Sequence, residues 1–364
     1  MKIAYFAPIY YYDLKQRPQH IAELLAETNE VYYIEPTISF MRYLLKGGDS
    51  YKGRKKQISS NLNVIQANGC LTGHISIQAL DFLHLNVISE YIQLHKVLDQ
   101  CDVIWVGYPG WYDLIYRYAG RKRIIYDKMD DHIAMAYNRL LRKLMIKVEP
   151  KLINVADDII VSCEIFYEEI KKQKDNVYLI RNAVPKDLCV FQNEKKEVCS
   201  SGKVFGYFGT VGEWFDQEAI RVILRANPMN RIIIVGKSLI DPIEDNRVEY
   251  VDQVVKKDLY KYVQRFDVCI YPFRKNAFLD TINPVKIYEY LAFNKPVIAV
   301  ASKETMPLEK YCHLYHNYEE LKMLCDKDLT LPFYEEGEYN RFLKANCWEK
   351  RVEHINQILA SSSR

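Results

Sequence analysis

Lys286 and Glu289 lie three positions apart in the segment NPVKIYEYLA, where we expect a helix to begin. Asn283 is a suitable N-cap and Pro284 suits the first helical position. A helix N-terminus offers free backbone N–H groups and a partial positive charge, so an ammonium group beside it makes a site for a diphosphate. The Glu289 carboxylate, one turn further on, can accept hydrogen bonds from two vicinal hydroxyls, as in a ribose. The pair therefore predicts a site for a nucleoside diphosphate.

An ordinary ion pair is the alternative interpretation, because Lys and Glu three positions apart pair on many solvated helix faces. The surroundings of this helix favour a binding site. The helix follows a polar loop after the apolar segment DVCIYPF, and the next segment, KPVIAV, is continuously apolar. In open α/β sheets, ligands bind at the carboxyl ends of such strands.

Glycines mark another strand end in the segment GYFGTVGEWFD. Gly206, Gly209 and Gly212 lie around it, and a glycine lets backbone amides approach a phosphate or a sugar without a Cβ in the way. An ordinary tight turn is the alternative. Gly236 and Lys237 end a further strand on the same expected edge, where Lys237 is either a second cation for the diphosphate or a solvated lysine.

Acidic residues and a histidine cluster in the segment YDKMDDHIA, just after an expected strand. Asp127, Asp130, Asp131 and His132 are close enough in the sequence to bind a divalent metal ion. One of them could instead orient or deprotonate a hydroxyl group of a substrate. Asp130 or Asp131 could also cap a helix that begins at HIAMAY, which is compatible with catalysis. We expect Asp130, Asp131 and His132 to take part in catalysis.

Two arginines follow expected strands at the same kind of edge. Arg17 and His20 begin the helix after the first strand, where Arg17 could meet a phosphate of the nucleoside diphosphate or of a lipid diphosphate. A polar first turn is the ordinary alternative. Arg274 follows DVCIYP, and its guanidinium group offers bidentate contacts to phosphate, unless it is a plain surface arginine.

Apolar segments of strand length alternate with helical patterns along the chain. In the first half we expect strands at KIAYFAP, VYYIEP, NLNVIQA, DVIWVG, RIIYD, DDIIVS and NVYLI. In the second half we expect them at KVFGYFG, RIIIVG, RVEYV, DVCIYP and KPVIAV. This alternation predicts two parallel, doubly wound α/β halves that face each other across a cleft.

A polar segment without periodicity, KDLCVFQNEKKEVCSSGK, separates the two halves. We expect a first domain at 1–185, a linker at 186–202, a second domain at 203–345, and a C-terminal helix at 346–364 that packs on either half. A chain of 364 residues is long enough for two domains of ordinary size.

The composition narrows the class of protein. An apolar fraction of 49% with 27% charged residues is typical of a folded protein, and a net charge of +3 gives no field that would drive nucleic-acid binding. Nine cysteines without a CxxC pair argue against a disulfide framework or a zinc site and fit a reducing cytoplasm. From the first residues, MKIAYFAPIYYYDLKQRPQH, we expect no signal peptide, and the printed sequence has no membrane-spanning run, GxGxxG motif or P-loop.

Two segments, 41–57 and 138–151, interleave cations with leucine, methionine or aromatic residues. Peripheral membrane-binding segments have this pattern, and we expect contact with the inner face of the cell membrane there. A charged outer helix face and a solvated loop are the alternatives.

The segment YPFRKNAFLDTINPVKIYEYLAFNKPVIAV resembles the donor-binding segment of GT-B glycosyltransferases, in which a polar loop, a KxxE helix start and an apolar strand recur. Five further segments are similar, in the same order, to bacterial cell-surface polysaccharide transferases related to the enzymes of teichuronic acid biosynthesis: QRPQHIAELLA, YDKMDD, IRNAVP, GYFGTVGEWFD and CWEKRVEHI. The resemblance covers most of the chain.

The resemblance implies that Lys286 binds the diphosphate and Glu289 the ribose of a nucleotide-sugar donor. It places further donor contacts at Gly209, Thr210, Lys237, Asp252, Gln253, Thr281 and Asn283. Many retaining members carry an acidic residue eight positions before the helix glutamate, where this chain has Thr281 with Asp280 adjacent. The role of that carboxylate in the sugar pocket therefore stays open. Arg274 corresponds to a position that faces the donor.

Together with these residues, the resemblance implies a cytoplasmic glycosyltransferase that moves a sugar from a UDP- or GDP-linked donor to a hydroxyl of a cell-surface glycan or a lipid-linked acceptor. The resemblance implies retention of anomeric configuration without a metal or other cofactor, while inversion with an aspartate of YDKMDD as the base stays open. A GT-A enzyme with a metal site at YDKMDD is a rival, against which the two α/β halves stand. A sugar-nucleotide epimerase of GT-B architecture and a non-catalytic glycan-assembly subunit remain alternatives.

Overall fold

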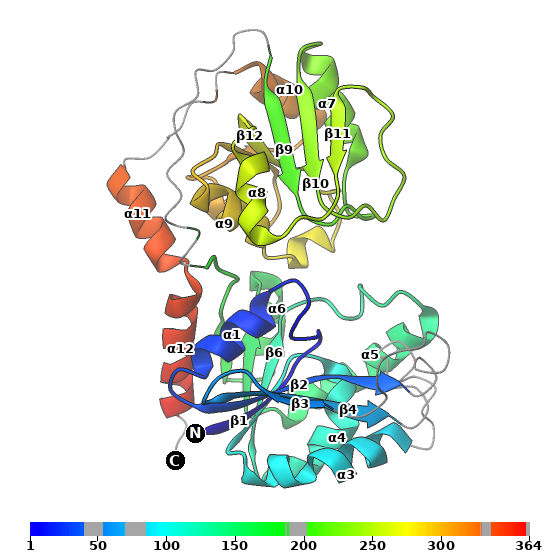
Figure 1. The fold of residues 1–364 in the computed structure, drawn as a ribbon, viewed down its shortest axis with the longest axis vertical. Helices are drawn as coiled ribbons and strands as arrows, with labels where there is room; N and C mark the ends of the chain where they lie inside the picture. The colour runs from blue at the N-terminus through cyan, green and yellow to red at the C-terminus, as the bar shows by residue number, and fades with distance from the viewer. Residues whose placement is uncertain are drawn as a thin grey trace. The chain divides into compact units, whose positions relative to one another are not determined.

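The structure is a computed structural model that describes residues 1–39, 54–69, 85–185, 188, 202–327, 329 and 336–361. The chain divides into two compact units (Figure 1). Unit 1 comprises Met1–Arg181 and Val352–Arg364, and unit 2 comprises Asn182–Arg351. Each unit has its own sheet and its own hydrophobic core. The prediction of two α/β halves is confirmed.

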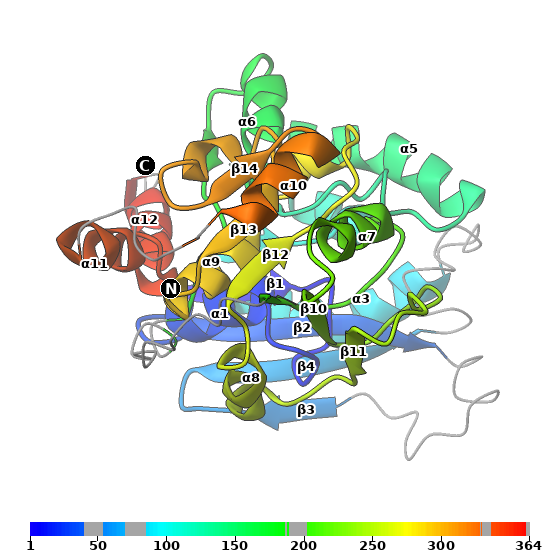
Figure 2. The ribbon, with the colours of Figure 1, turned by 90° about the horizontal axis from the view of Figure 1, so that it is seen from above.

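Unit 1 contains an eight-stranded sheet in the order β3-β4-β2-β1-β5-β6-β7-β8. Its strands are β1 (Lys2–Phe6), β2 (Glu30–Ser39), β3 (Arg54–Gln57), β4 (Leu62–Gly69), β5 (Val103–Val106), β6 (Arg123–Lys128), β7 (Asp158–Val161) and β8 (Val177–Leu179). Neighbouring strands are parallel, except that β3 pairs antiparallel with β4 at the edge of the sheet (Figure 2). Strands β5 and β7 are buried along their whole length, which is expected for central parallel strands covered on both faces.

The described helices of unit 1 connect these strands. They are α1 (Arg17–Leu25), α3 (Leu85–Gln100), α4 (Tyr112–Ile115), α5 (Arg139–Val155) and α6 (Glu164–Lys171), with short 3₁₀ turns at Pro109–Trp111 and Tyr116–Tyr118. The last helix, α12 (Trp348–Ser361), joins unit 1 from Val352 onward. Arg123 of β6 fixes the end of α12, because its guanidinium group donates to the carbonyl oxygens of Ile358 and Leu359 at 2.9 and 2.7 Å.

Unit 2 contains a six-stranded parallel sheet in the order β11-β10-β9-β12-β13-β14. Its strands are β9 (Val204–Phe208), β10 (Arg231–Val235), β11 (Val248–Val251), β12 (Val268–Tyr271), β13 (Val297–Val300) and β14 (His313–Tyr315). Its helices are α7 (Gln217–Ala226), α8 (Lys256–Val263), α9 (Val285–Ala292), α10 (Tyr318–Asp326) and α11 (Glu336–Ala345), with 3₁₀ turns at Leu279–Thr281 and Met306–Leu308.

Three local expectations need correction. The helix expected at HIAMAY is a single turn, and the helix begins later, at Arg139, with Asn138 as its N-cap. Asn283 is not the N-cap of α9: Pro284 holds that position, and the Asn283 side chain is used elsewhere. Strands β3 and β14 were not expected, because β3 reads RKKQ without apolar residues and β14 has only three residues.

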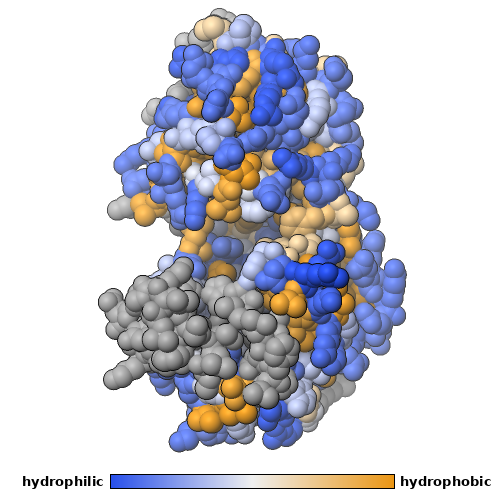
Figure 3. Space-filling view, turned by 90° about the vertical axis from the view of Figure 1, so that its right-hand side faces the viewer, coloured by the Kyte–Doolittle hydropathy of each residue, from blue (hydrophilic) through white to orange (hydrophobic). Residues whose placement is uncertain are grey.

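Most of the expected linker at 186–202 and of the basic segment 41–57 lies outside the described residues. Within the described ranges, no helix is both long and apolar enough to cross a membrane. Figure 3 shows hydrophilic residues over most of the described surface visible on each unit.

Candidate functional site

The carboxyl edge of the sheet of unit 2 has a switch point between β9 and β12. From β9 the chain continues to β10 and β11 on one side, and from β12 it continues to β13 and β14 on the other. The loops that leave β9 and β12 therefore diverge, and ligands bind at such points in doubly wound sheets. Two backbone hydrogen bonds join these loops, from Asp216 to Pro272 and from Arg274 to Trp214, both at 2.7 Å.

Two glycines let the loops after β9 and β10 approach closely. Gly209 and Gly236 have φ of +143° and +140°, a region that other residues rarely adopt. A Cβ on Gly236 would lie 2.3 Å from the carbonyl oxygen of Gly209. The N–H groups of Gly209 and Val211 donate to the carbonyl oxygens of Val235 and Lys237, both at 2.9 Å. Backbone packing at the switch point therefore requires both glycines.

Lys286 and Glu289 lie beside these glycine loops. A Cβ on Gly209 would be 3.2 Å from Cε of Lys286, and the Lys286 ammonium lies 4.9 Å from the ring centroid of Phe208. Nζ of Lys286 donates to Oε2 of Glu289 at 2.8 Å. The two side chains are only 25% and 15% exposed. The ion pair is thus held against the edge of the sheet, unlike a pair on a solvated helix face.

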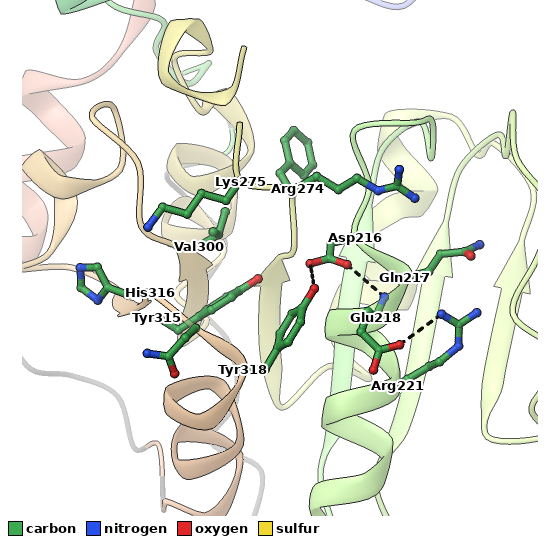
Figure 4. Close-up of a pocket in the computed structure, with 12 residues that line it drawn as sticks. Asp216, Gln217, Glu218, Arg221, Arg274, Lys275, Val300, Tyr315, His316 and Tyr318 are labelled. Atoms are coloured by element: carbon green, nitrogen blue, oxygen red, sulfur yellow. Dashed lines mark hydrogen bonds and ion pairs between the residues drawn. The ribbon is translucent and has the colours of Figure 1, made fainter. Parts of the chain in front are cut away.

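Arg274 lines a pocket of about 580 Å³ at the N-terminal ends of α7 and α10 (Figure 4). Arg274 and Lys275 are exposed, and their side chains extend in opposite directions from the loop after β12. Within the described part of the chain, neither side chain forms an ion pair. Asp216 also lines the pocket, where it caps α7 and accepts a hydrogen bond from the hydroxyl of Tyr318 at 2.9 Å. Two unpaired cations are therefore available beside the switch point.

Thr281 and Asn283, which also belong to the expected donor segment, hold the backbone that leads into α9. The hydroxyl of Thr281 donates to the carbonyl oxygen of Phe278 at 2.8 Å, and Thr281 is buried. The Asn283 amide accepts from the backbone N–H of Asn182 and donates to the Glu304 carboxylate, each at 2.8 Å. Because both ends of this amide are occupied, Asn283 fixes the approach to α9 in the structure described.

Thr210, Lys237, Asp252 and Gln253 are exposed at the same edge of the sheet. They follow the carboxyl ends of β9, β10 and β11, so the structure brings them to the side of the switch point opposite Arg274. Their side chains are available to a ligand, and their expected donor contacts stay a prediction.

In unit 1, Arg17 and Asp127 form a buried ion pair. Arg17 is 5% exposed and Asp127 is fully buried. The guanidinium group donates to both carboxylate oxygens of Asp127, with Nη2 to Oδ1 at 2.8 Å, and Nη1 donates to the carbonyl oxygen of Ile180 at 2.8 Å. A phosphate-binding role for Arg17 stays a prediction, and it would have to compete with these contacts. His20, also an expected acceptor residue, is buried in α1.

Asp130 lies close to this ion pair in the segment after β6. Burial raises the pKa of the Asp130 carboxyl above its usual value, and the nearby Asp127 carboxylate adds to the rise while Arg17 opposes it. A carboxyl group with a raised pKa can exchange a proton nearer to neutral pH than an ordinary aspartate. Asp130 is therefore the acid–base candidate of the cluster.

Asp131 and His132 have different surroundings. Oδ1 of Asp131 accepts the N–H groups of Ile133 and Ala134 at 3.1 and 2.9 Å, so this residue caps the turn. His132 packs edge-on against Tyr108, with ring centroids 5.2 Å apart. Burial and the Lys128 cation lower the pKa of His132 to about 3, so the ring is neutral at physiological pH. Its Nε2 is buried without a hydrogen-bond partner among the described residues.

The acidic residues after β6 were one possible set of ligands for a divalent metal ion. Among the described residues, no group of three or more His, Cys, Asp or Glu side chains is placed to hold one. Asp127 instead faces Arg17, and Asp131 faces backbone N–H groups.

The sequence did not single out three residues that shape the site in unit 2. Glu304 is 1% exposed and accepts a hydrogen bond from Asn283, Asp216 lines the pocket, and Lys275 adds a second cation to it. Glu304 lies outside the quoted segments, whereas Asp216 ends GYFGTVGEWFD and Lys275 lies in the segment YPFRKNAFLD, where neither was assigned a role. The N-cap position of Asp216 before QEAIRVILRA was the one available signal, since aspartate before an apolar helical pattern predicts a cap.

Comparison with known proteins agrees with this geometry. Residues 202–310 match the family described as glycosyl transferases group 1, a range that includes Gly209, Arg274, Lys286 and Glu289. The chain is 23% identical over 230 residues to a Bacillus subtilis (strain 168) protein, TuaH, named as a teichuronic acid biosynthesis glycosyltransferase. The match covers 57% of this chain and 57% of that protein, so the chain spans little more than half the length of this curated relative.

Three solved structures share the fold along the whole chain. A sucrose-phosphate synthase from Thermosynechococcus elongatus gives a TM-score of 0.69 at 15% identity and covers 99% of this chain and 98% of that one. A trehalose-6-phosphate protein from E. coli bound with UDP-2-fluoro glucose gives 0.70 at 11% identity, covering 98% and 99%. Anabaena Alr3699/HepE, in complex with UDP and glucose, gives 0.63 at 14% identity, covering 100% and 99%.

The two-sheet fold is the GT-B architecture of these solved structures, and within it residues 202–310, which carry the glycine loops and the switch point, match the group 1 glycosyl transferases. The chain is also distantly similar, over 57% of its length, to TuaH of Bacillus subtilis.

Proposed function

We propose that this protein transfers a sugar, with retention of anomeric configuration, from a nucleoside-diphosphate donor bound to unit 2 to a hydroxyl of a cell-surface glycan or a lipid-linked acceptor. The observation that carries the proposal is the position of Lys286 and Glu289. Their side chains are only 25% and 15% exposed and lie at the switch point of the sheet. They contact loops whose close packing requires glycine at 209 and 236.

The diphosphate is assigned to Lys286 and Arg274. Lys286 lies in the first turn of α9, where the helix dipole adds a partial positive charge. Arg274 is exposed on the neighbouring loop, and its planar guanidinium group suits bidentate contact with phosphate oxygens. As the bond to the sugar breaks, negative charge grows on the departing diphosphate, and these two cations stabilise it.

The ribose is assigned to Glu289. Its carboxylate already accepts one hydrogen bond from Lys286 and retains acceptor capacity for two vicinal hydroxyls. The base is assigned to the exposed Asp252 and Gln253 after β11. We assign uracil as the base because two solved structures of this fold were determined with UDP-2-fluoro glucose and with UDP and glucose.

The acceptor hydroxyl is assigned to the segment of unit 1 that contains Asp130, Asp131 and His132. Asp130 has a raised pKa and can exchange the hydroxyl proton, while Asp131 fixes the turn that carries it. The name of TuaH supports a polymeric envelope glycan as the acceptor. In the sugar pocket, Thr281 stands where many retaining relatives have a carboxylate, and its hydroxyl is bound to its own turn.

The first test is the affinity for UDP of the wild-type protein and of Glu289→Gln, measured by isothermal titration calorimetry. A hydrogen bond to a charged group contributes about 1.5–3 kcal/mol, so the variant should bind UDP roughly ten- to a hundredfold more weakly. Glu164→Gln is the matched control, because it makes the same change at an ion pair of the same 2.8 Å length in unit 1. Equal UDP affinity in wild type and Glu289→Gln would refute the ribose assignment.

The second test follows the products. The protein is incubated with UDP-sugars in the presence and absence of a membrane-derived glycan acceptor, and UDP release is measured. Acceptor-dependent UDP release supports transfer. An epimerised donor without acceptor would indicate an epimerase, and tight UDP binding without any turnover would indicate a glycan-assembly subunit.

A further inference from the structure

Helix α5 of unit 1 carries a row of cations along its exposed face. The exposed charged residues of this helix are Arg139, Arg142, Lys143, Lys147 and Lys151. Successive cations are three, one, four and four residues apart, which keeps them on one side of the helix, whereas Leu141, Met145, Val148 and Leu152 are buried on the other. The charged residues that the helix exposes to solvent are therefore all cations.

No exposed carboxylate balances this row on the helix. The one acidic residue of α5, Glu149, is 4% exposed and accepts hydrogen bonds from Lys128 at 2.6 Å and from the hydroxyl of Tyr126 at 2.5 Å. None of the five exposed cations forms an ion pair with a residue that the structure describes. In contrast, the exposed Arg221 and Arg225 of α7 both pair with Glu218.

Large apolar side chains are exposed beside the cations. Leu140 and Ile146 of α5 are 55% and 52% exposed, and Met135 and Tyr137, in the segment before the helix, are 55% and 66% exposed. An exposed apolar group of this kind stays in water only at a cost in free energy, unless another surface covers it. Figure 3 looks onto the side of unit 1 where α5 lies in Figure 1, and strongly hydrophilic and hydrophobic residues lie beside each other there.

We infer that α5 and the preceding segment, residues 135–151, form a docking surface for a membrane rich in anionic phospholipids. The lysines and arginines meet the phosphate groups at the surface of the bilayer, and Met135, Tyr137, Leu140 and Ile146 enter the boundary between headgroups and acyl chains. An interfacial helix has this combination of cations and bulky apolar residues. The unmixed positive charge is what selects an anionic lipid surface over a neutral one.

The position of this surface in the chain gives it a functional consequence. It begins three residues after His132, so the proposed acceptor residues and the docking residues share one segment between β6 and β7. A docked α5 would hold that segment at the membrane surface, where a lipid-linked acceptor lies. This consequence rests on the proposed function, but binding to the membrane does not require it.

The second basic segment, 41–57, does not join this surface in the described residues. Only 54–57 of it are described, and they form β3 at the edge of the sheet, whereas α5 connects β6 to β7 near the other edge. In Figure 2, β3 and α5 lie on different sides of unit 1. The inference therefore depends on α5 and its preceding turn.

The test is flotation of the full-length protein with vesicles of phosphatidylcholine alone and of phosphatidylcholine mixed with phosphatidylglycerol. We compare wild type with the triple variant Lys143→Gln, Lys147→Gln, Lys151→Gln. The matched control is Lys96→Gln, Lys172→Gln, Lys322→Gln, which removes the same charge from exposed lysines scattered over other helices. Unfolding temperatures of the three proteins are measured in parallel, and a variant is used only if it stays folded.

Wild type and control should float with the anionic vesicles and not with the neutral ones. Each cation near an anionic surface strengthens binding about fivefold, so the triple variant should bind roughly a hundredfold more weakly, and added salt should release the wild type. Ile146→Gln with Leu140→Gln gives a second measurement, which should weaken binding at unchanged charge. Three results would overturn the inference. The triple variant could float as well as wild type, or the control variant could lose as much binding as the triple variant. The wild type could also bind a single-stranded RNA more tightly than the vesicles.

Discussion

Replacing Arg17 by methionine tests whether this residue supports the fold or binds a phosphate. Methionine keeps much of the apolar stem of the side chain and removes the guanidinium group. In the wild type, that group gives Asp127 three hydrogen bonds, from Nε at 3.2 Å to both carboxylate oxygens and from Nη2 at 2.8 Å. The carboxylate is fully buried, so Arg17→Met leaves a buried charge without its partner.

The expected cost is about 3–5 kcal/mol of unfolding free energy, the usual result of removing one partner of a buried pair. The carbonyl oxygen of Ile180 also loses its donor at 2.8 Å, which adds about 1 kcal/mol. The double variant Arg17→Met, Asp127→Leu should recover most of this loss, because it leaves no buried charge. The coupling energy of the cycle should therefore be several kcal/mol.

Hydrogen–deuterium exchange of the β6 amides under native conditions is the suitable assay, because it reports on unit 1 even if the two units unfold separately. Faster exchange in Arg17→Met, with recovery in the double variant, is the expected result. A change of less than about 1 kcal/mol in Arg17→Met, together with loss of binding to a pyrophosphate-bearing acceptor, would refute the structural assignment and support the phosphate-binding prediction.

Three further outcomes are expected. Gly236→Ala should lower both the free energy of unfolding, measured in urea, and the affinity for UDP, measured by calorimetry. The reason is that the new Cβ would lie 2.3 Å from the Gly209 carbonyl oxygen at a residue with positive φ. Gly120→Ala is the control, because φ is also positive there (+73°) but a Cβ would have no neighbour within 4 Å. Arg123→Met should free the end of α12 and speed exchange of its amides; unchanged exchange would contradict this anchor. His132 has a folded pKa of about 3, below its ordinary value near 6.5, so stability should fall as pH drops from about 6.5 towards 3, and His132→Phe should flatten that slope in urea titrations.

Local patterns were sufficient to locate most elements. The apolar runs placed β1, β5, β7 and β9 to β13, and the helix signals placed α1 and α9, because a strand or helix buries its own side chains with a period set by its own geometry. They failed at β3, where charged residues on an edge strand carry no apolar alternation, and at the single turn after Asp131, where capping was expected to start a helix.

The sequence by itself determined which chemical groups the chain carries at its strand ends: Lys286 and Glu289 one turn apart, glycines at 209 and 236, and a carboxylate cluster before α5. The tertiary structure decided what those groups do. It paired Arg17 with Asp127, 110 positions away, joined Asn283 to Glu304, and packed Gly236 onto Gly209 beside Lys286. Such contacts depend on the order of strands in the sheet and on which side chains that order buries. The spacing of neighbouring residues in the sequence predicts neither of these.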